Sequence, residues 1–238
     1  IYSAGAGNQL IGVVEYSDFP EDAKTKPIVG NYHAVNIEKI IQLKPDIIFA
    51  WQGGSRPQDI EQLQRLGFKV QYSKPESLQD IATEIRKIGG LLGTSETAEK
   101  AAVKLETELK RVKLAYQQKN RLSVFYQIWD KPLMTINGQH FISQALQYCG
   151  AENSFKTLPL LAAEINLESL LHKNPEIILL GGDNSTQNNW LQYWQQYPQL
   201  QAVKNRHIYL INADIYQRPT ERFVMNIDAL CRQIDQAR

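Results

Sequence analysis

The hydrophobic positions along the first half of the chain follow two periods in turn, that of a buried strand and that of a helix. Short runs that are apolar on both faces are typical of strands in a parallel sheet covered by helices. Longer runs with apolar residues three and four positions apart are typical of amphipathic helices. Because the two alternate, the first half is predicted to be an α/β lobe with a parallel sheet. Its predicted strands are 11–16, 47–51 and 68–72, and its predicted helices are 37–43, 57–66 and 77–92.

The longest helical pattern, from about residue 95 to 119, follows this lobe. It contains neither Gly nor Pro, and its apolar residues recur at three and four. At ~1.5 Å per residue such a helix spans about 35 Å, enough to cross a small domain. A surface helix of a single domain is the alternative, but a position midway along the chain favours a rigid connector.

The second half returns to the alternation of strands and helices. We therefore predict an N-terminal α/β lobe at 1–93, a connecting helix at 94–120 and a C-terminal α/β lobe at 121–238. The second lobe has predicted strands at 122–128, 133–136, 176–180 and 207–211, and predicted helices at 140–149, 167–173, 188–196 and 219–236.

One segment occurs twice, once in each predicted lobe. Residues 36–48 align without a gap to residues 166–178. Each copy begins with Asn, a helix N-cap. Each then has Glu in the first turn, at Glu38 and Glu168, where the helix dipole favours negative charge, and each ends in Pro and a strand. Two related lobes imply a cleft between them, and such clefts bind ligands.

The composition excludes two classes of function. A formal net charge of +1 offers no basic stripe for nucleic acid. No apolar run approaches the ~18 residues that span a bilayer. Residues 1–7 do not have the pattern of a signal peptide. Because the chain starts abruptly before its first strand, we expect that a signal and a first strand are missing upstream.

The two cysteines, Cys149 and Cys231, each lie near the end of an apolar-periodic helix of the second lobe. Neither belongs to a CxxC motif or a Cys/His cluster, so no zinc site is expected. Buried free thiols and a disulfide between two helices both remain open. A disulfide would place the protein in an oxidising compartment.

The candidate ligand-binding residues lie at the carboxyl ends of predicted strands, where open α/β sheets bind ligands. Core packing explains any one of these aromatics, but several at strand ends in both halves favour an aromatic-walled pocket for a large, mostly uncharged ligand. Asp214 and Arg218 are either a surface ion pair or polar anchors of that pocket. The strand-end candidates are Tyr16, Trp51, Ile128, Trp129, Asp214 and Tyr216, and Tyr32 joins them from the loop before the first repeat helix.

No catalytic constellation is found in the sequence. The four histidines are scattered without metal-ligand spacing, and no nucleophile elbow, P-loop or dinucleotide fingerprint occurs. Gly53-Gly54 and Gly181-Gly182 follow strands, but two bare glycines are weak evidence for a phosphate loop. We therefore expect no enzymatic activity, no catalytic cofactor and no metal site.

Motifs spread over the whole chain carry a resemblance to a known family. They resemble those of the periplasmic vitamin B12-binding proteins that serve ABC importers, within the helical-backbone substrate-binding proteins. The resemblance covers all 238 residues, although the family's first strand and adjoining Ser-Pro turn are lacking. The motifs are Tyr16-Ser17-Asp18-Phe19-Pro20, Asn36-Ile37-Glu38, Leu43-Lys44-Pro45-Asp46 with Ala50-Trp51-Gln52-Gly53-Gly54, Cys149-Gly150-Ala151-Glu152-Asn153-Ser154-Phe155, Asp214 with Arg218, and Cys231.

The resemblance implies a fold and a function. The fold is that of a class III periplasmic binding protein, two α/β lobes joined by one long helix. Such a protein is a periplasmic monomer that captures cobalamin in the interlobe cleft and delivers it to the membrane subunits of an ABC importer. By the same resemblance Tyr16, Trp51 and Asp214 line the corrin pocket with Arg218 close by, Glu38 and Glu168 dock the importer, and Cys149–Cys231 is a disulfide.

Three positions depart from the family pattern. Tyr32 replaces a Trp, Ile128 beside Trp129 replaces an aromatic residue, and Ala162 replaces a pocket Trp. The predicted pocket is therefore less aromatic on the second lobe.

Two alternatives stay open. A siderophore or haem binder of the same fold is one; acidic siderophores usually need an Arg cluster, for which Arg56, Arg218 and Arg222 are the candidates. An α/β enzyme that uses the cleft, such as a glycosyl transferase or a chelatase, is the other. The absence of a catalytic cluster in the sequence and the paired glutamates argue against the enzyme.

Overall fold

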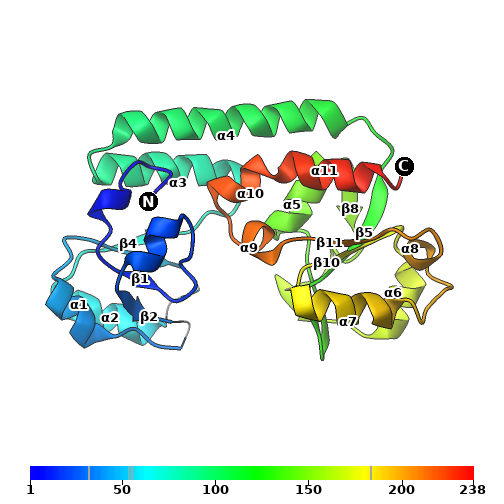
Figure 1. The fold of residues 1–238 in the computed structure, drawn as a ribbon, viewed down its shortest axis with the longest axis horizontal. Helices are drawn as coiled ribbons and strands as arrows, with labels where there is room; N and C mark the ends of the chain where they lie inside the picture. Colours follow the sequence, from blue (N-terminus) through cyan, green and yellow to red (C-terminus); the bar gives the residue numbers. More distant parts are fainter. Residues whose placement is uncertain (32, 53, 55, 183) are drawn as a thin grey trace. The chain divides into compact units, whose positions relative to one another are not determined.

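The computed structural model describes residues 1–31, 33–52, 54, 56–182 and 184–238 (Figure 1). These form two compact units. Unit 1 comprises Ile1–Pro75 with Thr83–Ala102, and unit 2 comprises Glu76–Ala82 with Val103–Arg238. The predicted long helix is α4 (Ser95–Tyr116), and its residues belong to both units, as do those of α3 (Leu78–Leu91).

Unit 1 contains two small parallel sheets. In the first, β1 (Val13–Val14) pairs with β2 (Ile28–Gly30), and in the second, β3 (Ile48–Trp51) pairs with β4 (Val70–Ser73). The helices α1 (Ile37–Leu43) and α2 (Pro57–Arg65) pack against the second sheet through a small core of Ile40, Ala50, Ile60 and Leu63.

Unit 2 is built on a four-stranded parallel sheet, in the order β11-β10-β5-β8. Its strands are β5 (Leu122–Gln127), β8 (Ala151–Asn153), β10 (Ile177–Leu180) and β11 (Ile208–Leu210). A second, antiparallel sheet of β6 (Trp129–Asp130), β7 (Leu133–Ile136) and β9 (Ala162–Glu164) follows β5. The predicted parallel α/β architecture is confirmed.

The repeated segment folds the same way in both units. The side chain of Asn36 accepts a hydrogen bond from the Lys39 amide at 2.9 Å, and that of Asn166 accepts one from the Ser169 amide at 2.7 Å. The helices α1 and α6 (Leu167–Lys173) have the predicted bounds. Each is followed by a capping residue with positive φ, 49° at Lys44 and 44° at Asn174, so the helix ends two residues before the proline.

The predicted helix 219–236 is in fact two helices, α10 (Glu221–Met225) and α11 (Ile227–Asp235). The break lies at Asn226, whose side-chain amide donates to the Arg222 carbonyl at 2.7 Å. The Asn226 carbonyl in turn accepts the Tyr216 hydroxyl at 2.8 Å. These side-chain bonds compete with the regular helical pattern and interrupt it.

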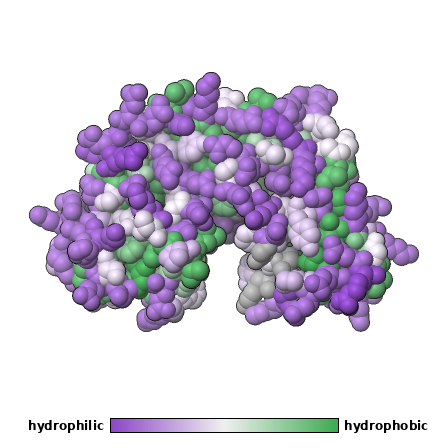
Figure 2. All heavy atoms as spheres, turned by 180° about the vertical axis from the view of Figure 1, so that it is seen from behind, coloured by the Kyte–Doolittle hydropathy of each residue, from purple (hydrophilic) through white to green (hydrophobic). Residues whose placement is uncertain are grey.

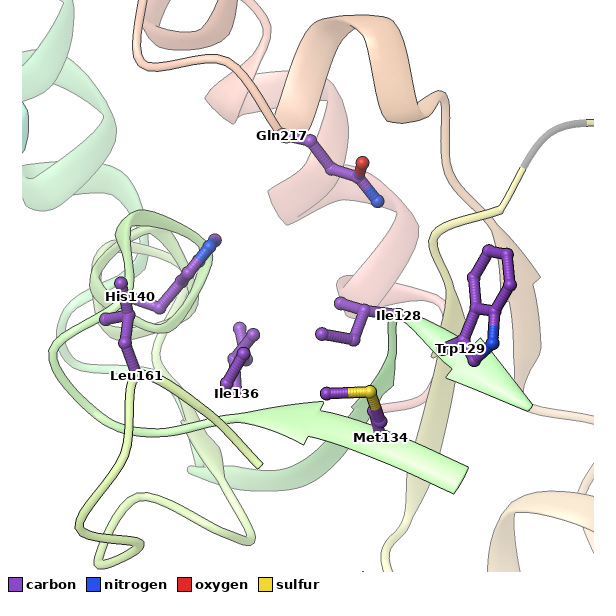
Figure 3. Close-up of a pocket in the computed structure, with 8 residues that line it drawn as sticks. Ile128, Trp129, Met134, Ile136, His140, Leu161 and Gln217 are labelled. Atoms are coloured by element: carbon purple, nitrogen blue, oxygen red, sulfur yellow. The ribbon is translucent and has the colours of Figure 1, made fainter. Parts of the chain in front are cut away.

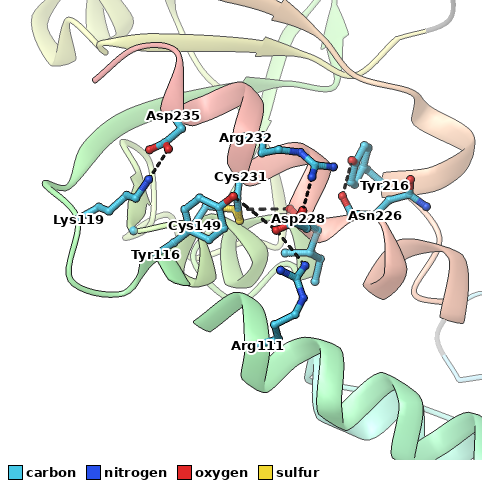
Figure 4. The surroundings of a disulfide bond; sticks show 12 residues. Arg111, Tyr116, Lys119, Cys149, Tyr216, Asn226, Asp228, Cys231, Arg232 and Asp235 are labelled. Carbon is cyan, nitrogen blue, oxygen red and sulfur yellow. Dashed lines mark hydrogen bonds and ion pairs between the residues drawn. A yellow bond between two sulfur atoms is a disulfide. The ribbon is translucent and has the colours of Figure 1, made fainter. Parts of the chain in front are cut away.

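The cysteines form the disulfide Cys149–Cys231 within unit 2, which confirms the pairing implied by the resemblance. Both residues are fully buried, one at the end of α5 (Phe141–Tyr148) and the other in α11. Figure 4 shows Asp228 nearby, where its carboxylate pairs with Arg111 at 3.0 Å and with Arg232 at 2.8 Å. The bond and this ion-pair cluster together tie α4, α5 and α11 to one another.

Candidate ligand-binding site

A pocket of about 410 Å³ opens in unit 2 (Figure 3). Its lining is mostly apolar, with two polar side chains and no Asp, Glu, Lys or Arg among its described residues. The polar residues are His140 and Gln217, and the apolar ones are Ile128, Trp129, Met134, Ile136, Leu161 and Ala162.

The pocket lies where the central strand β5 ends. Ile128 follows β5 directly, and the chain then turns through β6 into β7, where Trp129 pairs with Met134. The indole N–H of Trp129 donates to the Lys131 carbonyl at 3.2 Å, which holds the half-exposed ring at the pocket edge. The structure thus brings two of the predicted site residues, Ile128 and Trp129, into one pocket at the predicted end of the sheet.

His140 caps helix α5 at the pocket wall. Its Nδ1 accepts a hydrogen bond from the Ile142 amide at 3.2 Å. Burial lowers the pKa of the imidazole to about 4, so the ring is neutral at pH 7. Since one ring nitrogen accepts and the ring is neutral, the proton resides on Nε2.

Gln217 reaches the pocket from the end of the short helix α9 (Ala213–Tyr216). Its side-chain amide N–H groups donate to the Gly181 carbonyl at 2.7 Å and to the Tyr126 hydroxyl at 3.4 Å. These contacts fix which end of the amide is nitrogen, because a carbonyl can only accept.

The other predicted residues of unit 2 surround Gln217 in sequence. Arg218 donates to the Asp214 carboxylate at 3.0 Å, so these two form the predicted ion pair. Tyr216 instead points inward: its hydroxyl bonds to Asn226, its ring packs edge-on against Phe223, and burial raises the pKa of the phenol to about 12. We therefore assign Tyr216 to the core and not to the ligand-facing surface.

In unit 1 the predicted aromatics are exposed. Trp51 at the end of β3 is 58% exposed and Tyr16 after β1 is 74% exposed. A Cβ added at Gly54 would lie 2.4 Å from the Trp51 ring, so Gly54 lets the backbone pass closely under the indole. Tyr32, the third aromatic of this set, lies outside the described residues. The space-filling view shows hydrophobic residues exposed among a mostly hydrophilic surface (Figure 2).

The two predicted docking carboxylates are both at the surface. Glu38 and Glu168 lie in the first turns of α1 and α6 and are exposed. Among the described residues neither has an ion-pair partner, since no cation approaches either carboxylate within the 4.0 Å that defines a salt bridge.

The sequence did not identify His140, Gln217, Met134, Ile136 and Leu161 as pocket residues. The hairpin after β5 was a usable signal for Met134 and Ile136, because it must fold back over the strand end. For His140 and Gln217 no sequence signal existed, since their roles depend on contacts with other elements.

The described residues offer neither a metal cluster nor a membrane-spanning helix. No cluster of three or more His, Cys, Asp or Glu side chains is arranged to hold a metal ion there. In the same residues no helix has both the length and the hydropathy that crossing a membrane demands.

The sequence matches a known protein family over most of its length. The family model "Periplasmic binding protein" matches residues 1–215. The chain belongs to this periplasmic binding protein family.

Named relatives and solved structures agree with the family. The chain is 34% identical over 232 residues to a "Vitamin B12-binding protein" of Vibrio vulnificus strain YJ016, covering 97% of this chain and 84% of the relative. The crystal structure of the periplasmic vitamin B12 binding protein BtuF of Vibrio cholerae is similar, with a TM-score of 0.89 and 32% identity over 99% of this chain and 92% of that one. The periplasmic haem-binding protein HutB of Vibrio cholerae shares the fold at a TM-score of 0.85, with 16% identity over 98% of this chain and 93% of that one.

Proposed function

We propose that this chain binds cobalamin, vitamin B12, in the periplasm and delivers it to an ABC importer. The observation that carries the proposal is the near full-length identity of 34% to a relative named as a vitamin B12-binding protein. The haem-binding neighbour is only 16% identical, so it supports the fold and not the ligand.

The chemistry of the candidate site fits a corrinoid. A corrin ring is large and has apolar faces, while its rim carries neutral amide side chains. The pocket of unit 2 offers apolar surface from Ile128, Trp129 and Met134 and no ionised side chain among its described lining residues. Burying apolar surface gains roughly 25 cal/mol per Å², so a large ligand with apolar faces gains binding free energy from contact with this lining.

In unit 1 we assign ligand contacts to Trp51 and Tyr16. Both expose large aromatic rings, and neither is among the core residues Ile40, Ala50, Ile60 and Leu63 of the unit. We also assign Asp214 and Arg218 to the site, because they form an ion pair on the segment that contains Gln217. The chain acts by binding, and no covalent step is assigned to it.

Cyanocobalamin provides a direct test. Protein mixed with cyanocobalamin and then desalted should elute as a red fraction. The Trp51→Ala variant should bind more weakly by ~1–3 kcal/mol, because a stacked indole loses its apolar contact, while its melting temperature stays near that of the parent.

Two controls make the result specific. Leu66→Ala removes another exposed apolar side chain of unit 1, at the end of α2, and should leave affinity unchanged. A protein fraction whose visible spectrum lacks cyanocobalamin, while the same protein retains haem with its Soret absorption band, would reject the cobalamin proposal in favour of a haem binder. A large loss of stability in Trp51→Ala with unchanged affinity would show that the indole is a core residue.

A further inference from the structure

The lining of the unit 2 pocket includes a hydrogen-bond donor that has no partner among the described residues, the imidazole of His140. Nδ1 of His140 is occupied as the acceptor that caps α5, so the neutral ring carries its proton on Nε2. No described residue hydrogen-bonds to Nε2. The same occupation of Nδ1 and protonation of Nε2 leave the ring no free lone pair, so His140 acts as a donor and not as a metal ligand.

Gln217, also of the pocket lining, has an acceptor without a partner among the described residues. The amide nitrogen of Gln217 is committed to the Gly181 carbonyl at 2.7 Å and to the Tyr126 hydroxyl, both of which hold it in place. Its Oε1 therefore points away from Gly181, and no described residue donates to it. Figure 3 shows Gln217 and His140 bordering the same space, with Ile136, Ile128 and Met134 along its other side.

A hydrogen-bond donor and an acceptor in an apolar lining favour a neutral ligand group over a charged one. A ligand group that enters an apolar pocket loses its hydration and needs its polar atoms satisfied. A primary carboxamide supplies a carbonyl oxygen for an N–H donor and an NH₂ group for an oxygen acceptor. A carboxylate supplies acceptors only: it would face the Gln217 oxygen unfavourably and would find no cation among the described lining residues.

We propose that this pocket selects tetrapyrrole-like ligands whose rim groups are neutral carboxamides over those that present carboxylates. His140 Nε2–H donates to a carboxamide oxygen, and Gln217 Oε1 accepts from a carboxamide NH₂. The inference rests on the proposed function and sharpens it, because corrinoid amides satisfy the two atoms whereas corrinoid acids and the propionates of haem do not.

Two corrinoids that differ in their rim groups provide the test. Dicyanocobinamide carries carboxamides, and dicyanocobyrinic acid carries carboxylates on the same cobalt ring. The wild-type protein should bind the amide at least about tenfold more tightly at pH 7, since a site built around hydrogen bonds rejects groups that leave its polar atoms unpaired. Fluorescence quenching or calorimetry measures both dissociation constants.

Variants separate this selection from simple charge repulsion. His140→Asn keeps an acceptor at the Nδ1 position, so the cap on Ile142 remains, but it removes the Nε2–H donor. His140→Gln keeps a donor near the Nε2 position and removes the cap. We expect His140→Asn to lose roughly three- to tenfold of amide affinity, the worth of one net hydrogen bond, with an unchanged melting temperature. His140→Gln should keep the amide preference although it melts earlier.

Gln217→Met removes the acceptor with little change of volume. It should also reduce the ratio of the affinity for the amide corrinoid to the affinity for the acid corrinoid. Gln233→Met is its matched control, because the Gln233 amide also donates to a backbone carbonyl, that of Leu210, but does not line the pocket. Equal wild-type affinity for amide and acid, or variants that weaken both ligands equally, would overturn the selection while leaving corrinoid binding intact. A wild-type protein that binds neither corrinoid would instead reject the proposed function itself.

Discussion

The strands β3 and β10 come from the same repeated segment, yet the two units bury them very differently. In unit 2, β10 lies between β5 and β11, and all four of its residues are buried. In unit 1, β3 pairs with β4 alone among the described strands, and only Ala50 of its four residues is buried. The capping Asn, the left-handed helix end and the following strand are the same in both. The local fold therefore follows from the sequence of the segment, whereas the burial of the strand depends on how many strands pair with its edges.

The difference extends to the interior of each unit. A cavity of about 830 Å³ opens in unit 1, and it is lined by residues of both of its small sheets, among them Val13, Val29, Ile48 and Phe49. In unit 2 the corresponding strand is β10. Its residues Ile178 and Leu180 pack with Phe125 of β5 in one continuous core. Well-packed interiors lose more on truncation than loosely packed ones. We therefore expect unit 2 to be the more stable, and unit 1 to lose less stability when a buried side chain is truncated.

Removing the disulfide should give the largest effect and should be confined to unit 2. The bond closes a loop with a sequence separation of 82 residues, for which the chain-entropy model gives as much as ~4–5 kcal/mol. In a Cys149→Ala, Cys231→Ala protein, we expect amide exchange to accelerate in the peptide that contains β10 and to stay unchanged in the one that contains β3. Hydrogen exchange with mass spectrometry measures both.

Alkylation of the non-reduced, denatured parent protein is the control, and it should find no free thiol. Equal acceleration in β3 and β10 would break the comparison, because it would mean that the two units unfold as one cooperative body.

Truncation of the equivalent buried residues of the two repeat helices should give the next effect. Leu170 is fully buried in the core of unit 2, and Ile40 occupies the same repeat position beside the cavity of unit 1. We expect Leu170→Ala to cost ~3–5 kcal/mol and Ile40→Ala ~2 kcal/mol, because Ile40 has fewer packing partners to lose. Urea unfolding read by hydrogen exchange in each unit compares them. A larger cost at Ile40 would show that unit 1 is packed as tightly as unit 2.

The elements that the sequence predicted best are those whose boundaries are set by local chemistry. Helices 37–43 and 167–173 were predicted residue for residue, because Asn36 and Asn166 cap the start of each helix with their own side chains. The break at Asn226 was not predictable, because it depends on the hydroxyl of Tyr216 in another helix. The short strands β8 and β9 were missed because neighbouring strands, and not their own residues, make them strands.

The candidate site divides in the same way. Ile128 and Trp129 were predicted as ligand-binding residues because strand ends of parallel sheets meet at one edge. Both line the pocket of unit 2, and their contact with a ligand stays a prediction. Tyr216 was selected by the same rule, but it is held in the core by Asn226 and Phe223. His140 and Gln217 were missed because only the folded chain shows which of their polar atoms are occupied and which are open.

The smallest effect is expected where the two repeats are most alike. Glu38 and Glu168 are exposed at matched positions of α1 and α6, and no described residue neutralises either. We predict that both dock onto the importer and take no part in binding the ligand. Changing either to Lys should leave corrinoid affinity unchanged and weaken association with the importer by ~1 kcal/mol or more, because a rim charge reversal turns attraction into repulsion.

Salt and a matched control decide whether these carboxylates matter as charges. Exposed pairs are screened beyond ~10 Å at 0.1 M salt, so the loss in each Lys variant should shrink as salt rises. Glu61→Lys, on the exposed side of α2, reverses an equally exposed charge in unit 1 and should leave association unchanged. Since each unit contributes one carboxylate through the same local geometry, the two single variants should have similar effects even though their cores differ. Normal transport by the double variant would show that the glutamates only stabilise their helices through the helix dipole, by ~0.3–1 kcal/mol each. The similarity of the two repeats would then reflect a shared local fold and not a shared docking role.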